Sequence, residues 1–195
     1  MLQAVEITKN SKDLNTIKAL YESAFPENER VDFRFILANS EPDDEAFEIL
    51  AVYDGALFVG FVITLNAGDI SHILYFAVND KLRSKGYGSE ILQSVHTSRP
   101  GQRFIADVEK PDDTSSNNEQ RKKRIRFYDR NGYQKSEVEY RWNEEDYFIL
   151  SYKGGVSKEE YAAFWERQSD LLQRAANSKR PLEETAVPCD REQES

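Results

Sequence analysis

Two glycines separated by one residue, Gly86 and Gly88, lie in a polar segment between an apolar strand and an amphipathic helix. A glycine turn at the start of a helix leaves several backbone N–H groups free, with the positive end of the helix dipole behind them. The segment therefore predicts a site for a phosphate-bearing ligand. The alternative is an ordinary helix start that contains two glycines.

Three kinds of phosphate-binding loop can be compared with this segment. A nucleotide-triphosphatase loop needs Gly-x-x-x-x-Gly-Lys-Ser/Thr, which is lacking here. A dinucleotide fingerprint needs a third glycine where Ile91 stands, and it follows the first strand of its fold, whereas we expect at least three strands before this turn. The third kind, Arg-x-x-Gly-x-Gly opening a helix after an antiparallel meander, matches Arg83, Gly86 and Gly88.

A second segment, residues 124–133, ends in Phe-Tyr-x-x-x-Gly-Tyr and passes from a predicted helix into a strand. With both segments in this order and at this separation, the chain resembles the GNAT superfamily of N-acetyltransferases over about residues 3–152. The resemblance implies an α/β (α+β) fold with a mixed, twisted sheet and helices on both faces. It also implies that the sheet opens between its fourth and fifth strands into a V-shaped cleft for acetyl-CoA.

The resemblance also implies which residues hold the cofactor. The pantetheine arm would pair with an exposed strand edge, and the pyrophosphate would be wrapped by the amides of the glycine turn. The implied cofactor-binding residues are Phe76, Ala77, Val78, Arg83, Ser84, Lys85, Gly86, Tyr87, Gly88 and Ser89. The family often has an asparagine contacting the cofactor seven residues before its tyrosine. Here that position holds Arg121, which either meets a phosphate or marks a lost contact.

The implied reaction is direct attack of a neutral amine on the thioester. In the family, a tyrosine in the second motif commonly protonates the departing thiolate, and Tyr128 matches it. A phenol with a reference pKa of about 10 can protonate a thiolate of similar basicity. The alternative is that Tyr128 is a core aromatic beside Phe127.

Two side chains are candidates for the general base. His72 stands where the histone-acetylating branch of the superfamily has a glutamate, and strand alternation predicts that it shares a face with Phe76 and Val78. Glu109, at the end of the next parallel strand, points towards the expected cleft. The alternatives are a hydrogen-bonded strand histidine, a surface carboxylate, and a reaction that uses only ordered water.

Hydrophobic periodicity predicts the elements that position these residues. We expect strands at 3–8, 47–53, 56–65, 70–78, 104–108, 133–142 and 147–152, and helices at 11–25, 31–38, 86–96, 119–130 and 156–175, with an acidic loop at 41–45. The strand–helix–strand order from 70 to 108 makes a βαβ unit with parallel strands. The last helix is an addition to the family core.

The composition bounds the organisation and the partners. With 195 residues, 39% of them hydrophobic, we expect one acetyltransferase domain over 1–176 and a polar, disordered tail over 177–195. A net charge of −9 argues against a nucleic-acid partner, and the basic run at 121–124 is interpreted as a solvated face that attracts the anionic cofactor. The lone Cys189 forms no internal disulfide. No basic leader and no apolar run of about 20 residues is seen, so we expect a cytoplasmic protein without a membrane partner.

Three functions remain open at this point. The first is acetylation of a small-molecule amine such as a polyamine, amino acid or aminoglycoside. The second is acetylation of a protein lysine or N-terminus, which requires an open groove. The third is a non-catalytic acetyl-CoA sensor that signals through a partner at 156–175. Tyr128 beside an intact glycine turn favours catalysis, and the sequence leaves both a monomer and a homodimer open.

Overall fold

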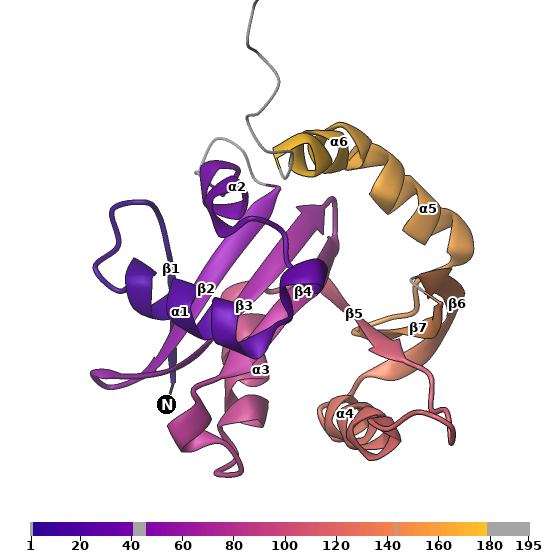
Figure 1. Cartoon of the computed structure of the whole chain (residues 1–195), viewed down its shortest axis with the longest axis horizontal. Helices are drawn as coiled ribbons and strands as arrows, with labels where there is room; N and C mark the ends of the chain where they lie inside the picture. The colour runs from indigo at the N-terminus through magenta and orange to yellow at the C-terminus, as the bar shows by residue number, and fades with distance from the viewer. Residues whose placement is uncertain (1, 41–45, 143, 179–195) are drawn as a thin grey trace, which may run out of the picture.

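The computed structural model describes residues 2–40, 46–142 and 144–178. One sheet has the strand order β1-β2-β3-β4-β5-β7-β6 (Figure 1). Its strands are β1 (Gln3–Glu6), β2 (Phe47–Asp54), β3 (Leu57–Ala67), β4 (Ile70–Val78), β5 (Arg103–Glu109), β6 (Gln134–Trp142) and β7 (Glu145–Tyr152). The β4–β5 pair is parallel and the other neighbouring pairs are antiparallel. The predicted mixed α/β sheet is confirmed.

Helices cover both faces of this sheet. They are α1 (Leu14–Ala24), α2 (Phe33–Ala38), α3 (Tyr87–Ser98), α4 (Asn118–Arg130), α5 (Lys158–Arg167) and α6 (Ser169–Ser178), with short 3-10 turns η1 (Glu27–Glu29) and η2 (Asp80–Leu82). Residues of α1, α2, α5 and α6 pack in one hydrophobic cluster, and residues of α3 and α4 pack in another. Among the described helices, none has the length and apolar character needed to cross a membrane.

The single helix predicted over 156–175 is wrong, because the chain breaks at Gln168 into α5 and α6. The Gln168 side chain is buried, and its Nε2 donates to the backbone oxygen of Asn66 at 2.9 Å. Of the predicted tail, α6 includes the first two residues, and residues 179–195 with Cys189 lie outside the described residues. The predicted acidic loop at 41–45 also lies outside them.

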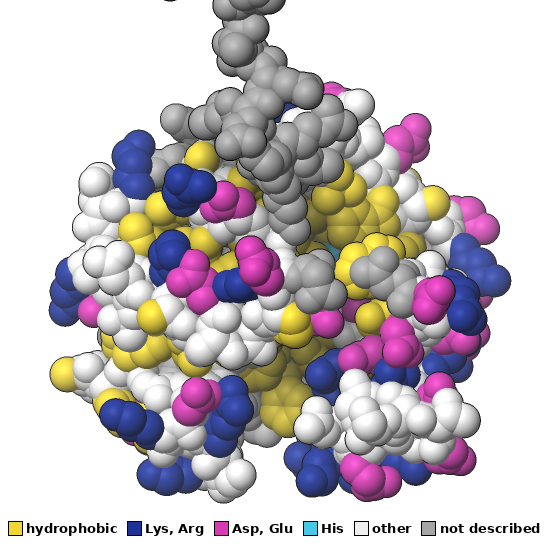
Figure 2. Space-filling view, viewed as in Figure 1, with side chains coloured by type: hydrophobic (Ala, Val, Ile, Leu, Met, Phe, Trp, Pro, Cys, Tyr) yellow, Lys and Arg dark blue, Asp and Glu magenta, His cyan; other side chains and the backbone are white. Residues whose placement is uncertain are grey.

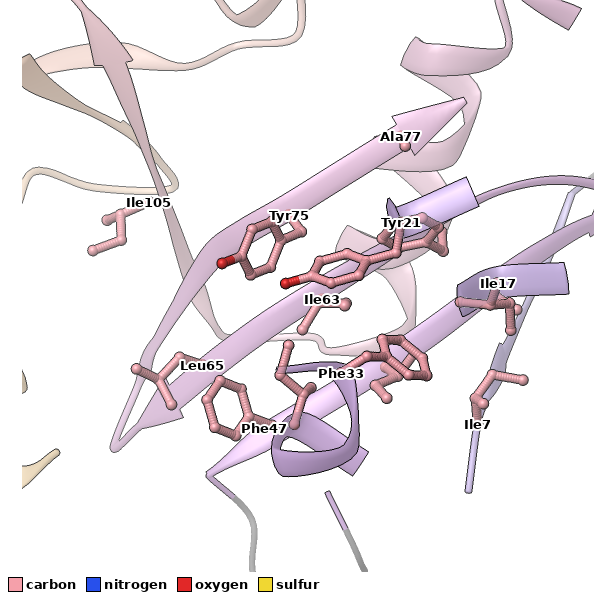
Figure 3. Packing of buried hydrophobic residues seen from close by; sticks show 14 of the residues in the cluster. Ile7, Ile17, Tyr21, Phe33, Phe47, Ile63, Leu65, Tyr75, Ala77 and Ile105 are labelled. Carbon is pink, nitrogen blue, oxygen red and sulfur yellow. The ribbon is translucent and has the colours of Figure 1, made fainter. Parts of the chain in front are cut away.

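Two buried tyrosines fasten the segment between α1 and α2 to the sheet. The hydroxyl of Tyr75 on β4 accepts from the amide of Val31 at 3.0 Å and donates to the carbonyl of Glu29 at 3.0 Å. The hydroxyl of Tyr21 on α1 donates to the carbonyl of Val31 at 2.8 Å. The two rings lie side by side in the core with their hydroxyls pointing the same way (Figure 3). The α1–α2 segment is thereby held over β4.

A β-bulge at Leu74 changes the direction of the side chains along β4. The register with β3 skips Leu74, so this residue is extra in its strand. Beyond it, Phe76 and Val78 pack in the α3–α4 cluster. The ring of His72 instead lies 5.8 Å from that of Phe164 on α5, on the opposite face. The prediction that His72 shares a face with Phe76 and Val78 is therefore wrong, because simple alternation does not continue through a bulge.

The sheet opens between β4 and β5. Their parallel pairing runs from Ile70 with Arg103 to Ile73 with Ala106 and then stops. Beyond that point β4 pairs with β3 as far as Val78, while β5 pairs with β7 as far as Glu109. The two strands therefore diverge (Figure 1), and the predicted opening between the fourth and fifth strands is confirmed.

An aromatic cluster joins the end of α3 to β7 and to Tyr133, which lies between α4 and β6. His96 is buried on α3, with its Nε2 at 2.9 Å from the Tyr133 hydroxyl and its ring stacked on Tyr152 at 3.8 Å between centroids. Burial, with a smaller contribution from the charge of the nearby Lys153, lowers the pKa of His96 to about 4. The folded protein therefore holds this imidazole neutral.

We expect the free energy of unfolding to fall as the pH drops from about 6.5 to about 4. Over that range the unfolded chain protonates His96 while the folded chain does not, which removes about 3 kcal/mol. Urea unfolding at pH 7 and pH 4.5 measures the loss. The loss should be smaller in His96→Gln, and an equal pH dependence in both proteins contradicts the prediction.

Candidate functional site

The glycine turn before α3 presents free backbone donors. Gly86 is the N-cap of α3 with φ +89°, a conformation that glycine adopts readily, and Ser84 has φ +64°. Among the described residues, no hydrogen-bond acceptor is found for the five consecutive amides that begin at Ser84 and end at Gly88. Free amides at the start of a helix form an anion-binding site.

Gly88 also lies close against α4, where a side chain would crowd Phe127. A Cβ atom at this position would lie 3.1 Å from Cε2 of Phe127 on α4. The Phe127 ring in turn lies 5.8 Å from that of Phe76 on β4, so α4 meets the other arm of the opening here. Hydrophobic side chains lie at the bottom of a hollow between the α3 and α4 regions, with Lys and Arg on its rim (Figure 2). Sequence reasoning had given Gly88 only the role of admitting a phosphate.

Several side chains of the predicted cofactor set already have protein partners. Arg83 pairs with Asp80 at 2.6 Å, and the pair is well exposed to solvent. The Tyr87 hydroxyl donates to Asp54 at 2.9 Å and so joins α3 to the β2–β3 turn. Ala77 is buried on the α1 side of β4. In this region the backbone amides, more than the side chains, are available to a ligand.

The remaining members of that set lie around the same opening. Lys85 is exposed, and Ser89 is half-buried in the first turn of α3. Phe76 and Val78 are half-buried and pack on the α3–α4 cluster. The structure therefore brings the end of β4 and the glycine turn together at one arm of the opening.

Tyr128 lies on α4 at the other arm. Its ring is buried, with its centroid 4.9 Å from that of Tyr133, and its hydroxyl has no hydrogen-bond partner among the described residues. Burial raises the pKa of this phenol, Arg124 one turn earlier opposes the rise, and Asp107 adds to it. The group therefore stays protonated at neutral pH and can donate a proton.

His72 forms a pair with Asp107, a residue of β5 that sequence reasoning missed. Nε2 of His72 lies 2.6 Å from Oδ2 of Asp107. His72 is fully buried, and the rings of Tyr161 and Trp165 on α5 lie 6.3 and 5.4 Å from it. The Asp107 side chain is 24% exposed, so it is the accessible member of the pair. Asp107 lies two residues before Glu109, and strand alternation from Glu109 was the signal that could have found it.

The pair leaves two buried polar atoms without partners among the described residues. They are Nδ1 of His72 and Oδ1 of Asp107. The hydroxyls of Tyr140 and Tyr161 are close enough to feel the charge of this carboxylate. Burial raises the pKa of both tyrosines, and the negative charge of Asp107 raises it further. The result is a polar cluster on the α5 side of the opening.

Glu109, the other predicted base, is engaged in an ion pair. Its carboxylate contacts Nη1 of Arg124 on α4, and its side chain is 16% exposed. Lys110, its neighbour in sequence, pairs instead with Glu139 at 2.6 Å. Glu109 therefore joins the end of β5 to α4 and is less available as a base than Asp107.

Arg121 is buried in contacts with the protein. Its Nε donates to Oδ1 of Asn117 at 2.7 Å, and its Nη1 donates to the carbonyl of Lys110 at 3.1 Å. Nη1 also lies 2.8 Å from the carboxylate of Glu145 on β7, and the Arg121 side chain is 4% exposed. These contacts fix the start of α4 to the strands, so the geometry favours a structural role over the predicted contact with a phosphate.

Arg121→Gln should lower the free energy of unfolding by about 2 kcal/mol, because it breaks buried, charge-assisted hydrogen bonds. Chemical denaturation measures the change. Lys122→Gln is the matched control, since Lys122 is more exposed and its ion pairs with Asp113 and Glu119 are both 3.5 Å long. Stability equal to that of the control would refute the structural role.

The comparisons with known proteins agree with this geometry. The family model described as an acetyltransferase (GNAT) domain matches residues 45–135, which include the glycine turn and Tyr128. No curated protein matches the sequence. Because the similar solved structures described next are each less than 25% identical to this chain, their likeness concerns the fold.

Three solved structures illustrate the likeness. A protein of Bacteroides thetaiotaomicron assigned to the GNAT acetyltransferases is 18% identical with a TM-score of 0.72, over 87% of this chain and 97% of its own. The ribosomal-protein-S18-alanine N-acetyltransferase of Escherichia coli is 16% identical with a TM-score of 0.55, over 82% and 97%. An aminoglycoside 6′-N-acetyltransferase complexed with coenzyme A is 15% identical with a TM-score of 0.57, over 76% and 94%.

Proposed function

We propose that the chain, whose residues 45–135 match the acetyltransferase (GNAT) domain, transfers the acetyl group of acetyl-CoA to a primary amine by direct attack. The observation that carries this proposal is the run of free amides from Ser84 to Gly88 at the opening between β4 and β5. The likeness to an aminoglycoside acetyltransferase solved with coenzyme A supports the same ligand class here.

The proposed cofactor path follows the free backbone groups. The amides of the glycine turn would bind the pyrophosphate, with the α3 dipole favouring its negative charge. The edge of β4 beyond Ile73 has lost its pairing with β5, so its backbone groups are available to the amides of a pantetheine arm. Phe76 and Phe127 would border this path.

The proposed chemistry uses Asp107 and Tyr128. The acceptor nitrogen forms a bond to the thioester carbon, the carbon–sulfur bond breaks, and the nitrogen gives a proton to Asp107. The thiolate takes the hydroxyl proton of Tyr128, which burial keeps protonated at neutral pH, and Tyr128 regains a proton from solvent before the next turnover. His72 is fully buried behind Asp107 and would act as its positioning residue rather than as the base.

A small-molecule amine is the proposed acceptor. Two elements cover the acceptor side: the α1–α2 segment, held by Tyr75, and α5, whose rings lie against His72. This cover leaves less room for a folded protein than an open groove would. Asp107, with the tyrosines near it, would suit a cationic amine. The similar enzymes include one for a ribosomal-protein alanine and one for aminoglycosides, so the fold alone does not select the acceptor.

Thiol release from acetyl-CoA, measured against polyamines, amino acids, aminoglycosides and lysine peptides, tests the proposal. We expect turnover with at least one small amine and none with Gly86→Val, because a β-branched residue is strained at φ +89° and would remove the anion site. Binding of acetyl-CoA without turnover across the panel would support the sensor instead. Absence of binding by calorimetry would overturn the proposal.

Tyr128→Phe and Asp107→Asn should each lower kcat about 100-fold while acetyl-CoA affinity changes little, because each removes one proton transfer. Steady-state kinetics and calorimetry separate the two effects. Tyr53→Phe is a control that removes a hydroxyl bonded to Asp13 on the β1–β2 side of the sheet, and it should retain most of the activity. An unchanged kcat in Tyr128→Phe assigns this residue to packing alone.

A further inference from the structure

A cavity of about 350 Å3 lies at the end of β4 opposite to the glycine turn. It is lined by the β3–β4 turn, by the segment after α3 and by the junction between α5 and α6. The strand begins at Ile70, close to this cavity, and ends at Val78, close to the glycine turn. At the usual rise of a strand this separation is about 25 Å. The cavity is therefore distinct from the anion site of the glycine turn.

Arginine side chains dominate the charge around the cavity. Arg99, Arg167 and Arg174 line it, against one carboxylate, that of Asp170. Nε of Arg99 is already bonded to Glu48 at 2.6 Å. Arg167 and Arg174 are exposed, and within the described part of the chain neither forms an ion pair, although the charge of Arg167 contributes to the lowered pKa of Asp69. Two available guanidinium groups favour an anion, since carboxylates and phosphates accept paired N–H donors.

A buried amide without partners lies in the same wall. Both Nδ2 and Oδ1 of Asn66 are buried and have no hydrogen-bond partner among the described residues. The backbone of Asn66 is satisfied, because its N–H donates to Ala46 at 2.8 Å and its carbonyl accepts from Gln168 at 2.9 Å. An unpaired buried polar group costs about 1–3 kcal/mol, so native proteins contain few of them. The amide therefore requires a partner that both accepts and donates a hydrogen bond.

We propose that this cavity binds a small organic anion that also carries a hydroxyl group, either a hydroxycarboxylate or a phosphate ester. Arg167 and Arg174 bind the charged group, and the side chain of Asn66, whose amide atoms are closed to solvent without the ligand, turns so that the hydroxyl both accepts from it and donates to it. The volume is near the lower end of about 300–1,000 Å3 for small-molecule sites, which suits a small metabolite. This proposal does not require that the protein transfers acetyl groups, so it can be tested separately from the proposed function.

Such a ligand would join the two layers that form the cavity. Gln168 lies at the break between α5 and α6 and bonds to Asn66 of the β3–β4 turn. A ligand held by Asn66 on one side and by Arg167 on the other adds a second link across the same junction. Binding should therefore raise the unfolding temperature of the whole chain.

The direct test is calorimetry on the full chain with citrate and, separately, glycerol 3-phosphate, each against sodium chloride of equal ionic strength. Both titrations are repeated in Gly86→Val, which lacks the anion site of the glycine turn. At least one probe is expected to bind saturably in both backgrounds, with a Kd on the order of 1 mM or lower. The probe that binds distinguishes a carboxylate from a phosphate ligand.

Two variants assign the binding to the cavity. Arg167→Gln with Arg174→Gln should weaken it at least tenfold, whereas Lys12→Gln with Arg34→Gln, an equal change of charge outside the cavity lining, should leave it within twofold. Asn66→Leu should abolish binding and leave the ligand-free unfolding temperature unchanged or higher, because the unpaired amide is gone. Binding that survives both cavity variants, or no binding beyond the chloride control, overturns the proposal.

Discussion

The parallel pairing of β4 with β5 ends at Ile73 and Ala106, and the arrangement of the candidate site follows from where it ends. Where two strands of one sheet separate, their facing backbone groups lose their partners, and something else must satisfy them. A ligand with amide groups of its own can do so. The glycine turn then follows β4 on one arm, and α4 with Tyr128 packs beside β5 on the other. The free amides of the glycine turn and the α4 helix with Tyr128 thus lie on the two sides of one opening because the sheet separates there.

The bulge at Leu74 allows one strand to serve both sides of that opening. Beyond it, Phe76 and Val78 turn to the α3–α4 side, where the cofactor would lie. Ahead of it, His72 turns to the α5 side and pairs with Asp107. A regular strand would have put these groups on one face. One extra residue separates them.

The sequence was sufficient to predict those features that depend on residues close together in the chain. Apolar periodicity predicted the strands and helices, and the glycines predicted the turn before α3, because each depends on neighbours in the chain. The opening of the sheet was implied by the resemblance that the two motifs carry. Prediction from the sequence failed where a feature depends on the register between two strands or on a partner that is distant in the sequence. The bulge at Leu74 exists only relative to β3. Arg121 looked like a free cation, because Glu145 and the Lys110 carbonyl become its partners only after folding. Asp107 lies between apolar residues in its strand, and its partner His72 is 35 residues away in the sequence. The break between α5 and α6 at Gln168 involves a hydrogen bond to the backbone of Asn66, which is also distant in the sequence.

The two C-terminal helices pack beside the beginning of β4, and the break between them gives each its own contact with the sheet. The rings of α5 close the buried side of His72, so the position of α5 determines how Asp107 is presented to the opening. At the other end of α5, Gln168 bonds to the β3–β4 turn, next to the arginine-lined cavity. One short helix therefore contacts the buried histidine behind Asp107 and, through the residue that follows it, the end of β3. The helical extension is thus part of the geometry of the acceptor side rather than an appendage to the sheet.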